Sequence, residues 1–459
     1  MAIPNLGRRN ASLTRVGRRP PHRSAALAVE TSTSGATVDP GFGSARGNQA
    51  APDLTDMNDT ATAPEQRVDS YDGVRSDAGG PRSNAGVVMH ANFDGEADFS
   101  AENCALALRL ARDEFPIQIA PVSGQPAQIE GTSAEGNRRG LQNLIQNRLD
   151  LAESVLYQSG VPTTWNLDFH GRCRVARAEF GTDRIPDGWA NRCNAVDELW
   201  LPSEFHRETF VASGVEPSKI RIIPRAIDSE VFQPTQSEFR IASEKSFRFL
   251  AITDGMFASG TDMLIQAFIE EFTPDEDVSL IIHATAGQFE REITDVEADV
   301  LYLIETRCGH KLEEIPPITL LSGPISERER SSLFASSHAF LQTARVQANG
   351  QHCLEALACQ VPVVAPDWGP LSDFLDHRNS FPLATAGLTL TNPEENDLFA
   401  GHRCAEPSFD HLRQQMREVF ANRKEAARRA EQGRHDVLNR FEWRVVLPEW
   451  IQNFRRLLE

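Results

Sequence analysis

The sequence predicts an α/β protein with two doubly wound domains, each a parallel sheet covered by helices, followed by C-terminal helices. Its 459 residues exceed the roughly 250–300 residues at which a single hydrophobic core stops growing. Apolar residues make up 40% of the chain and charged residues 24%, as in ordinary globular proteins. From residue 86 onward, short β-branched runs alternate with longer helical patterns, and this alternation occurs in two series.

The two series of predicted strands define the two domains. The first comprises 87–91, 117–122, 154–157, 174–178, 198–201 and 220–224. The second comprises 249–253, 279–283, 318–321, 339–342 and 362–365. Helices expected between strands include 101–112, with Ser100 as its N-cap, and 261–272, and the pattern from Phe409 onward is almost wholly helical.

These patterns give the expected domain boundaries. We expect an N-terminal Rossmann-like domain over 86–235 and a C-terminal one over 236–425. Residues 426–459 are expected to be helices that pack back on the N-terminal domain. Two such domains facing each other would place a ligand beyond the carboxyl ends of their strands.

Residues 1–85 differ from the rest of the chain. They are rich in Gly, Ser, Ala, Pro, Thr and Asp without apolar periodicity, so we expect this tail to be disordered. Its first 29 residues carry no acid and six arginines, namely Arg8, Arg9, Arg15, Arg18, Arg19 and Arg23. Such a start is typical of a transit peptide, although we favour a solvated tail or an over-long start; it lacks the apolar region of a secretory signal.

Charge and cysteine content exclude several classes of function. The net charge of −19 argues against sequence-independent binding to nucleic acid, which depends on basic surface. No apolar run reaches about 18 residues, so no transmembrane segment is expected. The seven scattered cysteines do not resemble a disulfide framework and favour a reducing, cytoplasmic compartment. Neither a metal-ligand spacing of His or Cys nor a GxxxxGK[ST] phosphate loop is present.

Two segments carry the candidate chemistry. The first, 199–214, reads LWLPSEFHRETFVASG and predicts a strand, a turn and a helix that Ser203 caps. In the second, 340–374, the Asn349-Gly350 turn would aim the backbone N–H groups of a helix start into the cleft, where they could bind an anion. One turn into that helix, Glu355 is either an acceptor for a ribose diol or a solvated carboxylate.

With these segments the chain resembles the retaining glycosyltransferases of the group-1, family-4-like type, which have the GT-B fold. The resemblance rests on "WLPSEFHRETFVASGV…KIRIIP…D", on "LEALACQVPVVAPDWG" and on the segment from Glu179 to Trp189, and it extends from about Gly86 to the C-terminus. It implies transfer of a sugar from a nucleotide-sugar donor to an unknown sugar, lipid or protein acceptor, with no cofactor and no metal.

The resemblance also implies roles for individual residues. In the family's Glu-x7-Glu pattern, Glu355 matches the second glutamate, which binds the ribose, whereas Gln347 stands in place of the first, which contacts the donor sugar. Backbone amides around Asn349, Gly350 and Gln351 and at Gly369 would hold the phosphates.

The family's basic pair, which neutralises the departing diphosphate, is replaced in this chain. Ala258 and Ser259 occupy its positions, and Arg345 or Arg225 would have to substitute in space. Loss of one such group commonly lowers the rate about 100- to 1,000-fold. Two smaller departures point the same way: Gln360 replaces the glycine that usually ends the helix, and Pro370 follows Gly369, which removes a backbone donor.

Three functional hypotheses follow. The first is a retaining, metal-independent glycosyltransferase with Glu355 at the ribose and Gln347 at the sugar. The second is a glycosyltransferase-like binding or scaffold protein that has kept the fold and lost the chemistry, as the missing basic pair suggests. The third is a phosphorylase or epimerase on the same fold, which dependence on inorganic phosphate would reveal.

Overall fold

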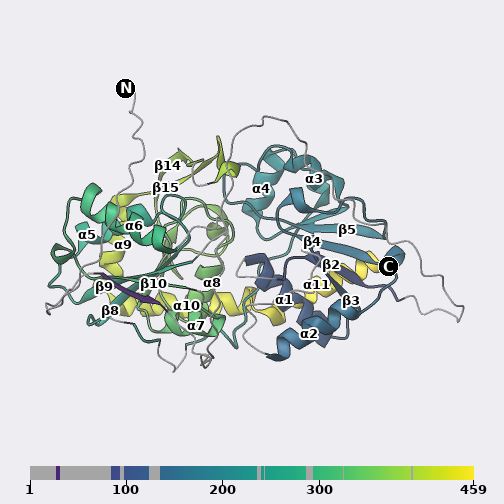
Figure 1. Ribbon diagram of the computed structural model, residues 1–459, viewed down its shortest axis with the longest axis horizontal. Coiled ribbons are helices and arrows are strands. Elements are labelled where there is room, and N and C mark those ends of the chain that lie inside the picture. Colours follow the sequence, from purple (N-terminus) through teal and green to yellow (C-terminus); the bar gives the residue numbers. More distant parts are fainter. Residues whose placement is uncertain are drawn as a thin grey trace, which may run out of the picture. The chain divides into compact units, whose positions relative to one another are not determined.

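The computed structural model describes residues 27–31, 84–93, 98–122, 135–234, 239–241, 243–285, 293–323, 325–393 and 396–459. The chain divides into one unit of residues 33–84 and a second unit made of all the others. The fold described below is that of the second unit (Figure 1).

The N-terminal domain contains a six-stranded sheet in which every paired neighbour is parallel, as predicted. Its spatial order is β3-β2-β4-β5-β6-β7. The strands are β2 (Val87–Ala91), β3 (Ile117–Pro121), β4 (Val155–Ser159), β5 (Cys173–Arg177), β6 (Glu198–Leu201) and β7 (Ile220–Ile222). Its helices are α1 (Asp98–Arg112), α2 (Glu135–Gln146), α3 (Trp189–Ala195) and α4 (Glu204–Ala212).

The start of α1 corrects one expectation. Ser100 was expected to cap a helix over 101–112, but α1 already includes Asp98, so Ser100 lies buried inside its first turn. The cap expected at Ser203 is confirmed: its side-chain oxygen accepts a hydrogen bond from the backbone N–H of His206 at the start of α4.

The C-terminal domain contains a seven-stranded parallel sheet in the order β1-β10-β9-β8-β11-β12-β13. Its strands are β1 (Leu27–Thr31), β8 (Phe247–Thr253), β9 (Val278–Ala284), β10 (Ile318–Ser322), β11 (Ala339–Leu341), β12 (Val363–Pro366) and β13 (Phe381–Leu383). Its first helices are α5 (Thr261–Glu271), α6 (Ile293–Tyr302), α7 (Glu327–Ala335) and α8 (Gln351–Ala358). The predicted pair of doubly wound sheets is thereby confirmed.

Strand β1 comes from the tail that was expected to be disordered. It pairs in parallel with β10 at the edge of the sheet, with Leu27 opposite Ile318. At Leu27–Thr31 the structure therefore differs from the expectation, because this short run has the open edge of β10 as a hydrogen-bonding partner. The other residues of the expected tail, apart from 84 and 85, lie outside the described residues.

A small antiparallel sheet was not predicted. Strands β14 (Thr385–Leu390) and β15 (Arg403–Pro407) pair in register from Leu390 opposite Arg403. Strand β14 is largely exposed, so it lacks the continuous apolar run that reveals a buried parallel strand in the sequence.

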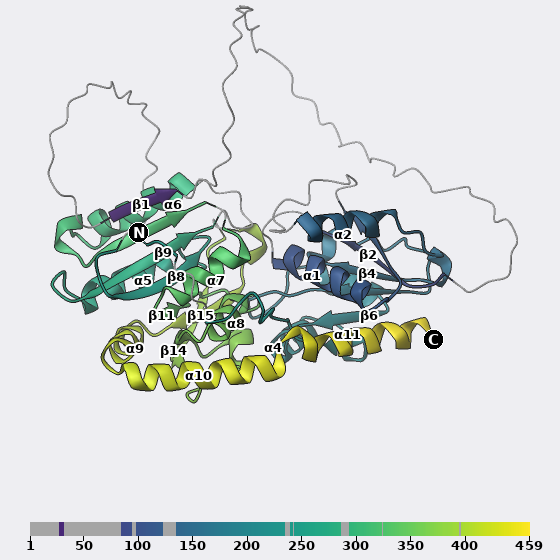
Figure 2. The same cartoon turned by 90° about the horizontal axis from the view of Figure 1, so that it is seen from below.

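Three helices end the chain: α9 (Phe409–Ala421), α10 (Arg423–Arg440) and α11 (Trp443–Leu458). Figure 2 shows α10 and α11 in yellow, one following the other. Gly433 of α10 lies against Leu357 of α8 in the C-terminal domain. The apolar side of α11 instead joins the core of the N-terminal domain, where the Trp450 ring lies 5.6 Å from Tyr157 and 5.3 Å from Trp200.

Two further expectations concern the chain as a whole. All seven cysteines are free thiols in the structure, and most are buried. Within the ranges that the structure describes, no helix combines the length and the apolar character needed to cross a membrane.

Candidate functional site

The candidate site lies where loops that follow strands of both domains meet. The segment after β5 runs along the segment after β11: the backbone N–H of Gln347 donates to the carbonyl of Gly181 at 3.4 Å. Asn349, two residues after Gln347, donates from Nδ2 to Oε1 of Glu179, two residues before Gly181, at 2.9 Å. Since both strands are parallel to their neighbours, this contact is at the carboxyl edges of the two sheets, where ligands of doubly wound domains bind.

Gly350 and the side chain of Asn349 shape the start of α8. Gly350 has φ +75°, and a Cβ there would lie 2.6 Å from Leu371 Cδ2, so both conformation and space call for glycine. Asn349 Oδ1 accepts a hydrogen bond from the N–H of Gln351 at 2.8 Å. One of the amides expected to face a phosphate therefore already has a side-chain acceptor.

Glu355 is buried, with 1% of its surface exposed, so it is not the solvated carboxylate of the simpler interpretation. Arg330 of α7 binds it with two parallel hydrogen bonds, Nε to Oε2 at 2.8 Å and Nη2 to Oε1 at 2.9 Å. His352 Nδ1 lies 3.1 Å from Oε2. Burial alone would raise the pKa of Glu355, but Arg330 and His352 outweigh it and lower the pKa to about 2. This carboxylate is ionised at neutral pH.

The guanidinium of Arg345 is bound by two carboxylates and a backbone carbonyl. Its guanidinium binds Glu406 through Nε at 2.7 Å and Nη2 at 2.9 Å, and its Nη1 binds Asp262 Oδ1 at 2.7 Å. Nη1 also donates to the carbonyl of Phe257 at 2.8 Å. Two carboxylates thus surround one buried guanidinium, and together they leave a net negative charge at this position.

Arg225, the other candidate substitute for the basic pair, is connected to the loop before α8 through Glu179 and Asn349. It pairs with Glu179 through Nη2 at 2.6 Å and Nε at 3.2 Å, and Glu179 in turn binds Asn349. Ala258 and Ser259, where the resemblance places the basic pair, carry no charge. The Ala258 carbonyl accepts from the N–H of Arg345, and Ser259 Oγ donates to Asp254.

Gly369 and Gln347 lie next to each other. Gly369 has φ +73°, and a Cβ there would lie 4.0 Å from Gln347 Cβ. Gln347 itself is 8% exposed. Pro370 stands in the first turn of the short 3-10 helix Gly369–Asp373, where its missing N–H leaves no helical hydrogen bond unmade. The structure therefore brings Gln347, Asn349, Gly350, Gln351 and Gly369 together, with Glu355 one turn behind them.

A histidine joins the two domains beside this site. His206 Nε2 donates to the carbonyl of Ala348 at 2.7 Å, and its Nδ1 lies 2.6 Å from Ser203 Oγ. A carbonyl can only accept, so the proton is on Nε2, and Nδ1 accepts from the serine hydroxyl. Burial lowers the pKa of His206 to about 3, which keeps the ring neutral.

Sequence reasoning missed four residues of this arrangement: Glu179, His206, Arg330 and His352. Glu179 and His206 stand within the motif segments, which marks the region without revealing their partners. His352 is three residues before Glu355, a spacing that places two side chains on one face of a helix. Arg330 carries no such signal, because it is 25 residues away from Glu355 on another helix.

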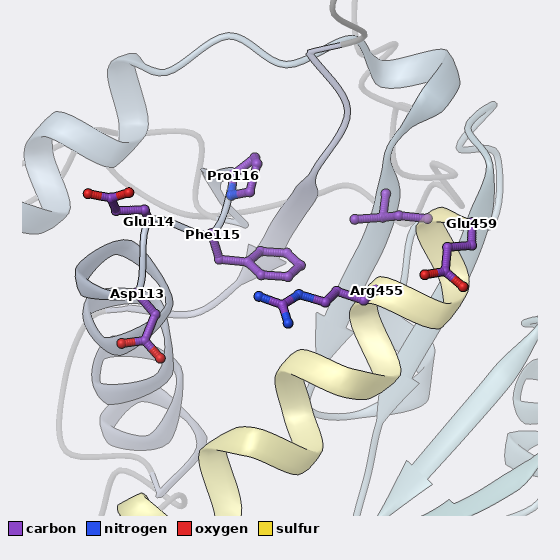
Figure 3. Close-up of a pocket in the computed structure, with 7 residues that line it drawn as sticks. Asp113, Glu114, Phe115, Pro116, Arg455 and Glu459 are labelled. Atoms are coloured by element: carbon purple, nitrogen blue, oxygen red, sulfur yellow. The ribbon is translucent and has the colours of Figure 1, made fainter.

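In the described residues, a pocket lies away from this site, and no group of metal-ligating side chains lies at it. In the described part of the chain, no three His, Cys, Asp or Glu side chains are grouped so as to hold a metal ion. A pocket of about 300 Å³ lies between residues 113–116 and Arg455, Leu458 and Glu459 (Figure 3). Residues 113–116 precede β3, so this pocket is at the amino edge of the sheet, and none of the expected site residues lines it.

Comparison with known proteins supports the fold. No family model matches the sequence, and no curated protein matches it significantly. Among solved structures, a glycosyltransferase from Rickettsia africae ESF-5 is similar with a TM-score of 0.61 and 13% identity, over 82% of this chain and 99% of that one. Sucrose-phosphate synthase from Thermosynechococcus elongatus gives a TM-score of 0.58 and 11% identity, over 81% and 99%.

A third similar structure contains a nucleotide sugar. HepE from Anabaena in complex with UDP-glucose gives a TM-score of 0.56 and 13% identity, over 81% of this chain and 100% of that one. At identities this low, the similarity is evidence for the fold alone. With its two parallel sheets in the same arrangement, the chain has the GT-B fold of these glycosyltransferases.

Proposed function

We propose that the protein is a glycosyltransferase that binds a nucleotide-sugar donor on its C-terminal domain and transfers the sugar to an acceptor. The observation that supports this most is Glu355, a buried carboxylate held ionised at the carboxyl edge of a parallel sheet. A group kept charged in a buried place at the ligand-binding edge of such a sheet is a functional-site candidate. Its neighbours Gln347 and Gly369 lie in the loops where donor sugar and phosphates are expected.

In this proposal each residue has a separate task. Glu355 accepts the hydroxyl groups of the ribose, and Gln347 donates and accepts hydrogen bonds at the donor sugar. Backbone amides of Gly350 and Gly369 face the diphosphate. Transfer proceeds with retention, without a metal or another cofactor, and the acceptor is a sugar, a lipid or a protein. The free cysteines fit a reducing, cytoplasmic compartment.

A second candidate is a protein that binds the nucleotide sugar or its nucleotide and does not transfer the sugar. The observation that favours it is the position of the cations. Arg345 is bound to Asp262 and Glu406, while Ala258 and Ser259 have no charge to offer. A departing diphosphate would then gain less electrostatic stabilisation, which is usually the largest catalytic contribution.

Turnover separates the two candidates. Purified protein is incubated with UDP-, GDP- and ADP-sugars. Release of the nucleoside diphosphate and formation of glycosylated product are measured, and donor binding is measured in parallel. The proposal expects release with at least one donor and its loss in Glu355→Ala. Tight binding without release supports the second candidate instead. Absence of both binding and release with every donor would contradict both, and phosphate-dependent release would indicate a phosphorylase.

A further inference from the structure

We propose that Glu179 of the N-terminal domain supplies the negative charge beside the transferred sugar, where the C-terminal domain offers only the neutral Gln347. This inference rests on the proposed function and assigns the task to a residue of the opposite domain. Its structural basis is one interdomain contact, in which residues 179–181 lie along residues 347–349.

The position of Glu179 is strongly constrained. Its side chain is 6% exposed and binds across the domain boundary to Asn349 at 2.9 Å. Two residues further, a Cβ on Gly181 would lie 2.5 Å from the carbonyl carbon of Gln347, so the absence of a side chain allows the two backbones to touch. The carboxylate is therefore held against the loop that carries Gln347.

Arg225 orients this carboxylate. Its Nη2 and Nε bind the two oxygens of Glu179 from the side of the N-terminal domain, at 2.6 and 3.2 Å. A bidentate guanidinium fixes the plane of a carboxylate. Asn349, bound to the same carboxylate through Oε1, also accepts a hydrogen bond from the N–H of Gln351 at the start of α8, so Glu179 is linked to the expected phosphate-binding loop.

Glu179 and two other carboxylates near this loop are each paired with an arginine. Glu355 is bound by Arg330 and His352 behind the loop, and Glu406 is bound by Arg345. Of these three described carboxylates, Glu179, which is bound by Arg225, also accepts a hydrogen bond from the loop between Gln347 and Gln351, through Asn349. Glu179 thus brings a carboxylate to the loop in which the C-terminal domain has the neutral amide of Gln347.

The chemistry of transfer calls for such a charge. The bond between the anomeric carbon and the diphosphate oxygen breaks, and its electron pair leaves with the diphosphate. A bond from the acceptor oxygen to the same carbon forms, and the acceptor proton passes to the diphosphate. Between these events the sugar resembles an oxocarbenium ion, and a fixed carboxylate lowers the energy of this positive charge.

The test moves the charge from one domain to the other. Glu179→Gln should lower kcat about 100-fold or more and change the KM for the donor less than about threefold. Adding Gln347→Glu to that variant should restore kcat at least about tenfold, because the carboxylate then stands on the facing loop. Thermal midpoints of all variants are measured, since Glu179→Gln also removes the partner of Arg225.

Glu102 provides the matched control. It forms a buried bidentate pair with Arg177 in the same domain, at 2.8 and 2.9 Å, and lies on α1, away from the segment from Glu179 to Gly181 in the chain. Glu102→Gln should therefore lower the thermal midpoint as much as Glu179→Gln does, and leave kcat within about threefold of wild type.

The outcomes distinguish this inference from the proposed function. A wild-type protein that turns over no donor contradicts the proposed function, and this inference with it. An active wild type whose kcat is unchanged in Glu179→Gln overturns the inference alone. So does a loss of kcat that Glu102→Gln reproduces, or one that Gln347→Glu does not recover, because either result would make Glu179 merely a structural partner of Arg225.

Discussion

Single charged residues determine what this site can do, and their partners could not be predicted from the sequence. Glu355 was identified as a candidate from its place on a helix after an Asn-Gly turn. Its pairing with Arg330 depends on how α7 and α8 pack, which the local pattern does not contain. Arg345 was considered as a replacement for the basic pair, but Asp262 and Glu406, 83 and 61 residues away, bind it instead.

Backbone strain at Gln360 was predictable, because the position follows the end of a helix where glycine is usual. Gln360 has φ +59°, in the left-handed region that costs a residue with a side chain roughly 1 kcal/mol. Its side chain is exposed, so little packing would be lost on removing it. Gln360→Gly should raise the free energy of unfolding by about 1 kcal/mol in urea denaturation, whereas Gln360→Ala, still strained, should not. Equal stability of the two variants would contradict this explanation.

At the scale of elements, hydrophobic periodicity predicted most strands of both sheets within a few residues. It succeeded because parallel strands buried on both faces read as continuous apolar runs. Strands β13 and β14 were missed for two different reasons: β13 is buried but only three residues long, and β14 exposes most of its side chains. The start of α1 was placed too late because a serine near a helix start resembles a cap whether or not the helix begins there.

Helix α11 is expected to stabilise the N-terminal domain through its aromatic side. Phe454 is fully buried, and its ring lies 4.9 Å from Trp200 and 6.0 Å from Tyr157. Truncation of a buried Phe typically costs about 3–5 kcal/mol, so Phe454→Ala should strongly lower the thermal midpoint. Val445 of the same helix is 42% exposed, and Val445→Ala should change stability by less than about 0.5 kcal/mol. Similar losses in both variants would show that α11 does not depend on this aromatic contact.

At the scale of the whole molecule, polar contacts of single side chains join the domains around the candidate site. His206 binds the Ala348 carbonyl, Glu179 binds Asn349, and Asp183 exchanges two hydrogen bonds with the backbone of Arg403. The two-domain architecture could be predicted from length and alternation. These contacts could not, because they depend on which loops meet when both sheets have formed.

The buried histidine makes stability depend on pH. The pKa of His206 is about 3 in the folded protein and about 6.5 when unfolded, so below pH 6.5 the unfolded chain takes up a proton that the folded one refuses. Stability therefore falls as the pH decreases, and for this residue the loss between pH 7 and pH 5 is about 2 kcal/mol. His206→Gln, which keeps a donor for Ala348, should reduce that loss by this amount in urea denaturation at the two pH values. An unchanged pH dependence would show that His206 does not titrate in this way.

The most direct test of the donor site is calorimetric titration of UDP, GDP and ADP into two variants that break the same ion pair from opposite sides. Glu355→Gln removes the carboxylate proposed to bind the ribose, whereas Arg330→Gln leaves that carboxylate in place and removes its arginine partner. We predict that the nucleotide bound by the wild type binds Glu355→Gln about 10- to 100-fold more weakly, since a hydrogen bond to a charged group contributes about 1.5–3 kcal/mol. Arg330→Gln should bind it at least as tightly as wild type. Equal weakening in both variants, or none in Glu355→Gln, would contradict a ribose site at Glu355.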